Sequence, residues 1–199
     1  MKKLSFAIIF ACIAMASMAQ DAIRVNYHGK KPTISDFAWA FVTALDEDED
    51  ECGDEPTNAI LEALTRYRAG QPQEDGVTLT VDEKNGYLLY EFGYDTVDVK
   101  MEMCYWNETD GKHKLFAFNN MSTFVGGRLT MTETSGLIFY RYNNATKKMT
   151  YCAPPGFEVD YDCSYALPRS GKNIIVTRWD DIVPVSERTL KWNGHNFSF

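Results

Sequence analysis

The fold is decided by residues 100–120, which read KMEMCYWNETDGKHKLFAFNN. Two alternating, strand-like runs flank Asp110-Gly111, a dipeptide that favours the positive backbone angles of a tight turn. Because successive side chains of a strand point to opposite faces, Met103 lies on one face of the first run and Cys104 on the other. Neither face is polar throughout. The stretch therefore predicts a central β-hairpin whose two faces are both covered by other parts of the chain.

Similar strand-like runs continue from residue 76 to residue 199. The Asn85-Gly86 dipeptide between two of these runs is the strongest short hairpin signal in the sequence. Short turns join most of the runs, so neighbouring strands should be antiparallel. The expected strands are Val77–Val81, Tyr87–Phe92, Val97–Trp106, Lys112–Asn119, Arg128–Thr132, Leu137–Tyr142, Lys148–Cys152, Asn173–Arg178, Arg188–Trp192 and Asn196–Phe199.

Two helical patterns come before the strands, within residues 33–70. Thr33 can cap the first helix, and Asp36 stands at the position of a capping-box partner. The apolar side chains that follow recur at the spacing of one buried helical face. They are Ile34, Phe37, Ala38, Phe41, Val42 and Leu45.

The second helix should begin at Asp54 or Thr57 and end at Ala69, because Gly70 supplies a stop. Helices followed by a run of strands indicate an α+β fold. The sequence predicts an N-terminal helical hairpin packed on a mostly antiparallel, meandering sheet of about nine strands. A strongly curled sheet or a partly open barrel is the alternative. Residues 20–199 are expected to form a single domain.

Residues 1–19 have the form of a secretory signal peptide. Lys2 and Lys3 supply the positive start, Leu4–Ala16 the apolar segment, and Ser17–Ala19 the small residues before the cleavage site. The apolar segment is short for a transmembrane span. The sequence therefore predicts an exported protein without an integral membrane span, located in the periplasm, at the cell surface or outside the cell.

The end of this signal, Ala19-Gln20, resembles the export signals of Bacteroidetes secreted proteins, which implies a bacterial source. Lipoprotein processing at Cys12 is the alternative. It would place the apolar residues Ile13–Met15 directly after the lipid anchor, where a polar tether is expected. Cleavage after Ala19 is therefore the prediction.

The chain has a net charge of −8, and its acidity is concentrated in one segment. Eight of the 28 acidic residues lie in Asp46–Glu55. The sequence lacks the stripe of basic residues that would indicate a nucleic-acid partner. Asp46, Asp48 and Asp50 have the spacing of the first ligands of a calcium loop, but Glu51 replaces the glycine that such a loop requires. A solvated loop is the expectation, with these three aspartates as the alternative calcium candidate and with no other metal or cofactor.

Four cysteines remain after removal of the signal, an even number suited to an oxidising compartment, and they allow three pairings. The turn-forming Pro154-Pro155 segment favours a Cys152–Cys163 disulfide, which leaves Cys52–Cys104 as the second bridge. This second bridge requires the helical hairpin to pack on the sheet face that carries Cys104. The absence of a Cys-x-x-Cys motif argues against zinc.

The search for catalytic residues finds no complete set. His28, His113 and His195 lie near turns and lack the spacing of metal ligands, so they are interpreted as exposed turn residues. Asp180 and Asp181 could serve a glycosidase, which needs two carboxylates across a cleft. Adjacent residues of a strand face opposite ways, however, so this pair alone cannot form such a site.

Aromatic residues are the remaining signal, with 11 Tyr, 12 Phe and 4 Trp. On an exposed sheet, Tyr and Trp bind sugars or peptide segments, whereas inward-facing rings are ordinary core. The leading interpretation is an exported, non-catalytic binding module for a glycan, peptide or protein ligand. The alternative is an exported, glycosidase-like hydrolase with a dispersed carboxylate site.

Overall fold

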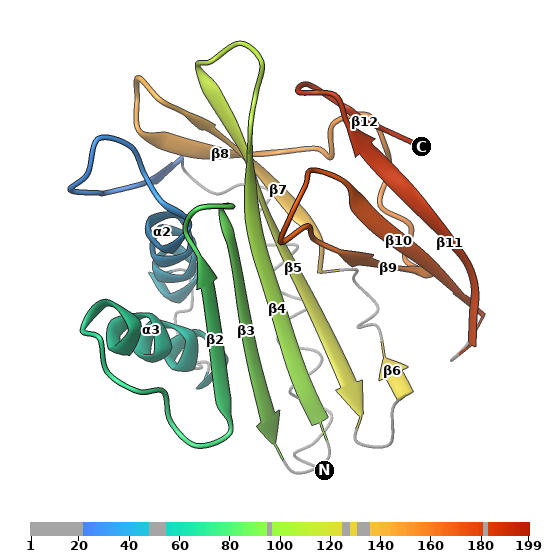
Figure 1. The fold of residues 1–199 in the computed structure, drawn as a ribbon, viewed down its shortest axis with the longest axis horizontal. Helices are drawn as coiled ribbons and strands as arrows, with labels where there is room; N and C mark the ends of the chain where they lie inside the picture. Colours follow the sequence, from blue (N-terminus) through green and yellow to red (C-terminus); the bar gives the residue numbers. More distant parts are fainter. Residues whose placement is uncertain (1–21, 48–54, 95–96, 125–127, 131–135, 181–182) are drawn as a thin grey trace.

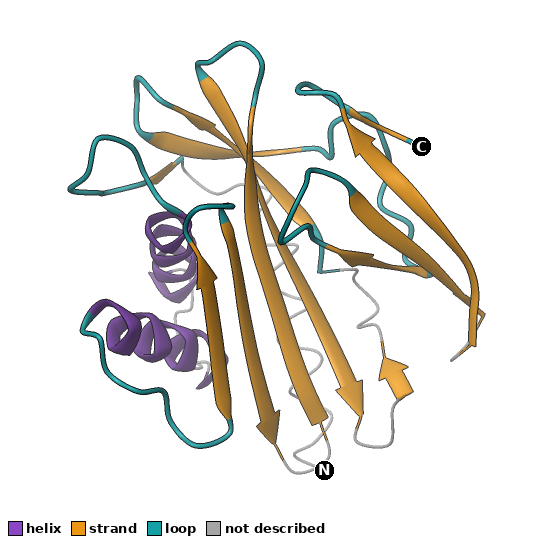
Figure 2. Ribbon diagram, viewed as in Figure 1, coloured by secondary structure: helices purple, strands orange, loops and turns teal. Residues whose placement is uncertain are grey.

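The computed structural model describes residues 22–47, 55–94, 97–124, 128–130, 136–180 and 183–199 (Figure 1). The described residues form two helices and two antiparallel sheets. The helices cover one face of the larger sheet, and the smaller sheet packs on its other face (Figure 2). The fold is α+β, as predicted. Two sheets replace the single expected sheet, and the larger one keeps two separate edges, so it is not closed into a barrel.

The strand orders follow from short antiparallel connections. The larger sheet has the order β1 (Ile23–Arg24), β8 (Lys148–Cys152), β7 (Ile138–Asn143), β5 (His113–Phe124), β4 (Val97–Asn107), β3 (Tyr87–Tyr94) and β2 (Val77–Asp82), with β6 (Arg128–Thr130) beside β5. The smaller sheet has the order β12 (Phe197–Ser198), β11 (Val183–Trp192), β10 (Ile174–Asp180) and β9 (Cys163–Ala166).

The β4–β5 hairpin is the centre of the larger sheet, as its two-sided apolar pattern predicts. Met103 pairs with Phe118 and Cys104 with Ala117 across the hairpin. Met103 is buried in the core shared with the helices, whereas Cys104 is buried in the core shared with the smaller sheet. Gly111 takes a φ of 66° in the connecting turn, which explains the Asp-Gly signal.

The helices α2 (Ile34–Glu47) and α3 (Glu55–Arg68) closely match the predicted ranges. The Thr33 N–H donates to Asp36 Oδ2 at 2.9 Å, which confirms Asp36 as the partner of Thr33 at the start of α2. A further cap comes from Glu83 in the β2–β3 turn, whose Oε2 accepts the Ile34 N–H at 2.9 Å. A carboxylate at this position also favours the positive end of the helix, so Glu83 ties the helical layer to the sheet.

Aromatic rings fill the core between α2 and the larger sheet. The Phe37 ring lies 4.9 Å from that of Tyr142 and 5.2 Å from that of Tyr105, measured between centroids. One turn further on, the Phe41 ring lies 5.0 Å from that of Phe118. Such edge and tilted contacts add to the hydrophobic burial of the rings. All six residues of the predicted apolar face of α2 are therefore confirmed as core.

The second core joins the two sheets and includes a strand that the sequence did not reveal. β9 is only four residues long, and β11 begins at Val183 instead of Arg188. The start of β11 was not predicted because Pro184 lies in it, and a proline in a sequence run argues against an ordinary strand. Trp106 of the larger sheet packs on Trp192 and Phe197 of the smaller one, with ring centroids 6.1 and 5.2 Å apart.

Two buried polar side chains hold β9 against the larger sheet. The cross-strand partners Glu102 and Asn119 are 3% and 2% exposed. Glu102 Oε2 accepts the Leu167 N–H at 3.1 Å, and Asn119 Nδ2 donates to the Tyr165 carbonyl at 2.6 Å. The Tyr87 hydroxyl donates to Glu102 Oε1 at 2.7 Å. Side chains, instead of another strand, thus bond to the backbone at the free edge of β9 and directly after it.

Replacing Glu102 by alanine tests this arrangement. Glu102→Ala leaves the Tyr87 hydroxyl and the Leu167 N–H without their partner in the core, so the free energy of unfolding should fall by roughly 2–4 kcal/mol. Urea denaturation measures this change. The control is Glu91→Ala on the exposed side of β3, where a change within about 0.5 kcal/mol is expected. Equal losses in the two variants would contradict the role of Glu102.

Candidate functional site

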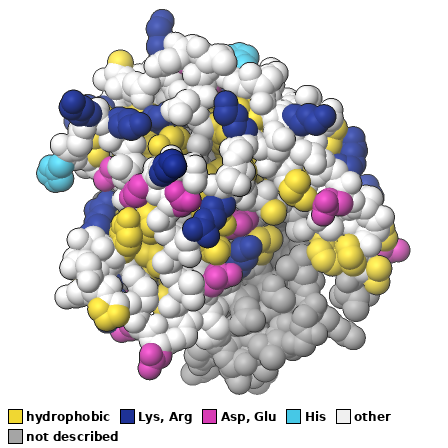
Figure 3. Space-filling model, viewed as in Figure 1, with side chains coloured by type: hydrophobic (Ala, Val, Ile, Leu, Met, Phe, Trp, Pro, Cys, Tyr) yellow, Lys and Arg dark blue, Asp and Glu magenta, His cyan; other side chains and the backbone are white. Residues whose placement is uncertain are grey.

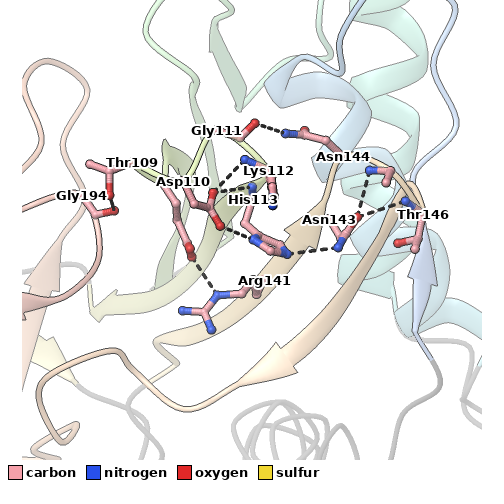
Figure 4. Close-up of polar contacts among 12 residues, drawn as sticks. Thr109, Asp110, Gly111, Lys112, His113, Arg141, Asn143, Asn144, Thr146 and Gly194 are labelled. Carbon is pink, nitrogen blue, oxygen red and sulfur yellow. Dashed lines mark hydrogen bonds and ion pairs between the residues drawn. The ribbon is translucent and has the colours of Figure 1, made fainter.

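A polar network lies where the β4–β5 turn meets the β7–β8 turn (Figure 4). Both ring nitrogens of His113 have partners: Nδ1 lies 2.5 Å from Asp110 Oδ2, and Nε2 lies 3.1 Å from Asn143 Nδ2. Asp110 comes from the turn itself, and Asn143 is the last residue of β7. The network therefore joins two turns that lie 30 residues apart in the sequence.

Asn143 determines which nitrogen of His113 carries the proton. Its Oδ1 accepts the N–H groups of Ala145 and Thr146 at 2.9 and 3.1 Å, so its Nδ2 must face the histidine. Nδ2 is a donor, and Nε2 of His113 is therefore the acceptor. The ring proton then lies on Nδ1 and is donated to Asp110.

Asp110 is the acceptor on which the turn depends. Its Oδ1 accepts the backbone N–H groups of Lys112 and His113 at 2.7 and 3.0 Å. The hydrogen bond from the His113 side chain is the largest cause that lowers the pKa of the Asp110 carboxyl to about 2, and the bond from the Lys112 backbone adds to it. The ionised carboxylate of Asp110 therefore stabilises the hairpin turn.

Glu108 completes a group of three side chains that could in principle hold a metal ion. Ligand atoms of Glu108, Asp110 and His113 lie within 4.8 Å of one another. Metal binding at Nδ1 would move the ring proton to Nε2, where it would face the amide donor of Asn143. Arg141 Nε also lies 2.7 Å from Glu108 Oε1 and supplies a positive charge there. The donor set therefore fits a hydrogen-bond network better than a metal centre.

The smaller sheet is attached to the same turn. The Thr109 N–H donates to the Gly194 carbonyl at 3.0 Å, and Gly194 has a φ of 98°. A side chain at position 194 would collide with the Thr109 methyl group, so this close approach requires glycine. The interpretation of His28 and His195 as exposed turn residues agrees with the structure, whereas His113 is half-buried in the network.

The outer face of the smaller sheet is the second candidate site. Ile174 and Val176 face the core, so the alternate residues Ile175 and Thr177 face outward. The Trp179 indole Nε1 donates to Ser164 Oγ at 2.8 Å, which holds the ring beside β9.

The tip of the β10–β11 hairpin carries exposed apolar side chains. Val183 and Val185 are 56% and 53% exposed, and residues 183–188 of β11 are all exposed. Figure 3 shows hydrophobic side chains gathered at the right-hand end of the molecule, over this tip. An exposed apolar cluster of this kind marks an interaction surface or an aggregation hazard.

The described cysteines form no disulfide. Cys104, Cys152 and Cys163 are free thiols, and burial is the largest cause that raises the pKa of both Cys152 and Cys163 to about 11. Neither predicted bridge, Cys152–Cys163 or Cys52–Cys104, is seen, and Cys52 lies outside the described residues. The argument for Cys52–Cys104 was wrong because α2 packs on the opposite face of the sheet from Cys104.

Two other predicted sites are not placed by the structure. Asp48 and Asp50 of the calcium candidate lie outside the described residues, and Asp46 lies in α2 with its side chain outside them. Asp181 of the carboxylate pair is also outside the described residues, while Asp180 is exposed at the end of β10.

Comparison with known proteins identifies no relative of this chain. No family model, no curated protein and no solved structure matches this chain. Among the described residues, neither helix is long and apolar enough to cross a membrane.

The Asp110 network predicts a pH-dependent loss of stability. Asp110→Asn should lower the melting temperature at pH 7, because the ionised carboxylate accepts three hydrogen bonds. Because folding lowers the pKa of Asp110 from its ordinary value near 4 to about 2, the ionised carboxylate stabilises the fold above about pH 4. This stabilisation is lost as the pH falls towards 2 and the carboxylate becomes protonated. Calorimetry should therefore show the gap between variant and wild type closing over that interval. Asp75→Asn, at an exposed carboxylate, is the control, and a gap that stays constant would contradict the role of Asp110.

The position of Cys104 predicts its chemistry. Its side chain is 2% exposed and burial raises the pKa of the thiol, so maleimide should label it only after denaturation. Peptide mapping under non-reducing conditions measures this labelling. Thr78→Cys, at an exposed position of β2, supplies a control thiol that should react at once. Recovery of a Cys52–Cys104 disulfide would contradict the assignment of Cys104 to the face away from the helices.

Proposed function

We propose that this protein is an exported, non-catalytic interaction module that binds its ligand through the smaller sheet. The observation that carries the proposal is the exposure of Val183 and Val185 at the tip of the β10–β11 hairpin. Helices and the smaller sheet cover the two faces of the larger sheet. Among the described residues, the outer face of the smaller sheet and its hairpin tip are the sheet surfaces that no other layer covers (Figure 2).

The surface combines apolar and polar groups in the manner of protein interfaces. Trp179 is half-buried and is held beside β9 by its bond to Ser164. Arg178 lies 3.6 Å from both Asp160 and Asp162, which orders the charged margin of the sheet. Aromatic anchors and a polar rim are enriched at interfaces of this kind.

The hydrolase alternative gains no support from Glu102 and Glu108, the two buried carboxylates among the described residues. Glu102 is held by Tyr87 and the backbone of Leu167, and Glu108 is held by Arg141. Both glutamates are almost completely buried, so neither is open to a substrate. Glycoside hydrolysis needs two accessible carboxylates that face each other across the sugar.

The test combines binding and turnover on the same preparation. Residues 20–199 are applied to a glycan array and to an array of random linear peptides, and are assayed in parallel with a panel of glycosidase substrates. Binding is expected without turnover. The double variant Val183→Asp with Val185→Asp should weaken that binding at least tenfold, because charges replace the exposed apolar tip.

The matched control changes an exposed side chain far from the smaller sheet. Tyr67→Ser on α3 alters a residue that is 37% exposed and should leave binding unchanged. Reproducible turnover that is lost when a carboxylate is changed would overturn the proposal, as would binding that survives the change at the hairpin tip.

A further inference from the structure

The direction of the backbone groups along β11 follows from two hydrogen bonds at its end. The Trp192 N–H points towards β10, where it donates to Asn173 Oδ1 at 3.4 Å. The Asn193 N–H points the other way and donates to the Asn196 carbonyl at 3.1 Å, on the side of β12. Backbone groups of alternate residues in an antiparallel strand point to opposite neighbours. The backbone N–H and C=O groups of odd-numbered residues at this end of β11 therefore point away from β10.

This alternation leaves a short row of backbone groups on the outer edge of β11 that no described strand pairs with. The alternation that is fixed at Trp192 and Asn193 directs the N–H and C=O groups of Arg188 towards its partner Val176 of β10. It directs the N–H and C=O groups of Glu187 and Thr189 away from β10. β12 begins to cover this edge only at Lys191. Within the part of the chain that the structure describes, no strand pairs with the edge before Lys191.

The other end of the open edge is closed by a proline. The Trp179 N–H donates to the Asp162 carbonyl at 2.8 Å, on the side of β9, so its partner Pro184 faces the outer edge of β11. Pro184 has no N–H to offer a further strand. The pairing of β10 and β11 also shifts register between Arg178 and Trp179. Prolines and bulges are the usual devices that limit pairing at a sheet edge.

The charges along this edge disfavour a second copy of the chain. A two-fold pairing centred on Arg188 would place two arginines directly opposite each other. A pairing centred on Glu187 would do the same with two glutamates. Like charges at directly opposed positions destabilise a strand pair. The charges of Glu187 and Arg188 therefore disfavour these two registers of self-pairing and favour a partner strand of different sequence.

We propose that the outer edge of β11 binds an extended peptide segment of a partner protein, which adds a strand to the smaller sheet and places an acidic side chain opposite Arg188. The inference rests on the proposed function and names its ligand class. In this mode of recognition, main-chain hydrogen bonds supply affinity and alternate side chains supply specificity. The Arg188 guanidinium lies 3.7 Å from the centroid of the Phe199 ring, which holds the positive charge at the edge.

The experiment separates the contribution of the backbone N–H to peptide binding from that of the side chain at one position, Thr189. Thr189→Pro removes the outward N–H, whereas Thr189→Ala keeps it and removes only the hydroxyl and methyl groups. Because the Thr189 N–H makes no bond to β10, the proline removes no hydrogen bond from the existing sheet. Thermal melting checks the fold. Glu187→Pro with Glu187→Ala is the second pair should Thr189→Pro fail to fold.

The probes are short synthetic peptides of alternating Val and Thr, with Asp, Ala or Lys at the central position. Methylation of alternate amides leaves each peptide one pairing edge and prevents self-association, and a fully N-methylated copy is the blank. Fluorescence anisotropy measures their affinities for residues 20–199. The Asp peptide should bind about two- to five-fold tighter than the Ala peptide, and the Lys peptide more weakly than both. Thr189→Pro should abolish binding, and Thr189→Ala should leave it within about two-fold.

Several outcomes would overturn the inference. Equal affinities of the two Thr189 variants, or no preference for the acidic peptide, would mean that the ligand does not add a strand at this edge. If binding on the arrays still depends on Val183 and Val185, the proposed function would survive that result. Sedimentation of a wild-type dimer that Thr189→Pro dissociates would assign the edge to a second copy instead. Failure of all peptides, together with turnover in the substrate panel, would overturn both proposals.

Discussion

The structure depends on the way in which a polar strand edge is buried between two sheets. An unpaired edge in a core leaves backbone groups without partners, and each such group costs free energy. Here Glu102 and Asn119 of the larger sheet bond to the backbone of Leu167 and Tyr165. Burial and the neighbouring carboxylate of Glu102 also raise the pKa of the Tyr87 hydroxyl, so this hydroxyl stays a donor. Four strands can therefore pack on the larger sheet without extending it.

The sequence predicts the central hairpin, both helices and most strands because these elements depend on local periodicity. It does not predict which layer covers which face. Met103 and Cys104 mark two faces that are both apolar, and nothing in the alternation distinguishes a face for helices from a face for a second sheet. The disulfide argument failed at this point. β9 was missed because four residues are too few for a periodic signal, and its partners Glu102 and Asn119 are distant in sequence.

The polar network shows the same limit at the scale of a single side chain. The Asp-Gly turn near His113 is evident in the sequence, but Asn143 is 30 residues away and only the strand register of β5 and β7 brings the two together. The bonds from Asn143 to the next turn then determine the tautomer of His113. A residue that reads as an exposed turn histidine is thus part of a network that joins the loops at one end of the sheet.

The β10–β11 hairpin combines two features that oppose each other. Val183 and Val185 are exposed, which favours association, while Pro184 and the register shift beside it restrict pairing with other strands. If the hairpin had no partner, polar residues at the tip would remove the hazard at little cost to the core, because residues 183–188 do not contribute to it. A surface that keeps apolar side chains but limits the length and charge of the strand that can join it favours selective association.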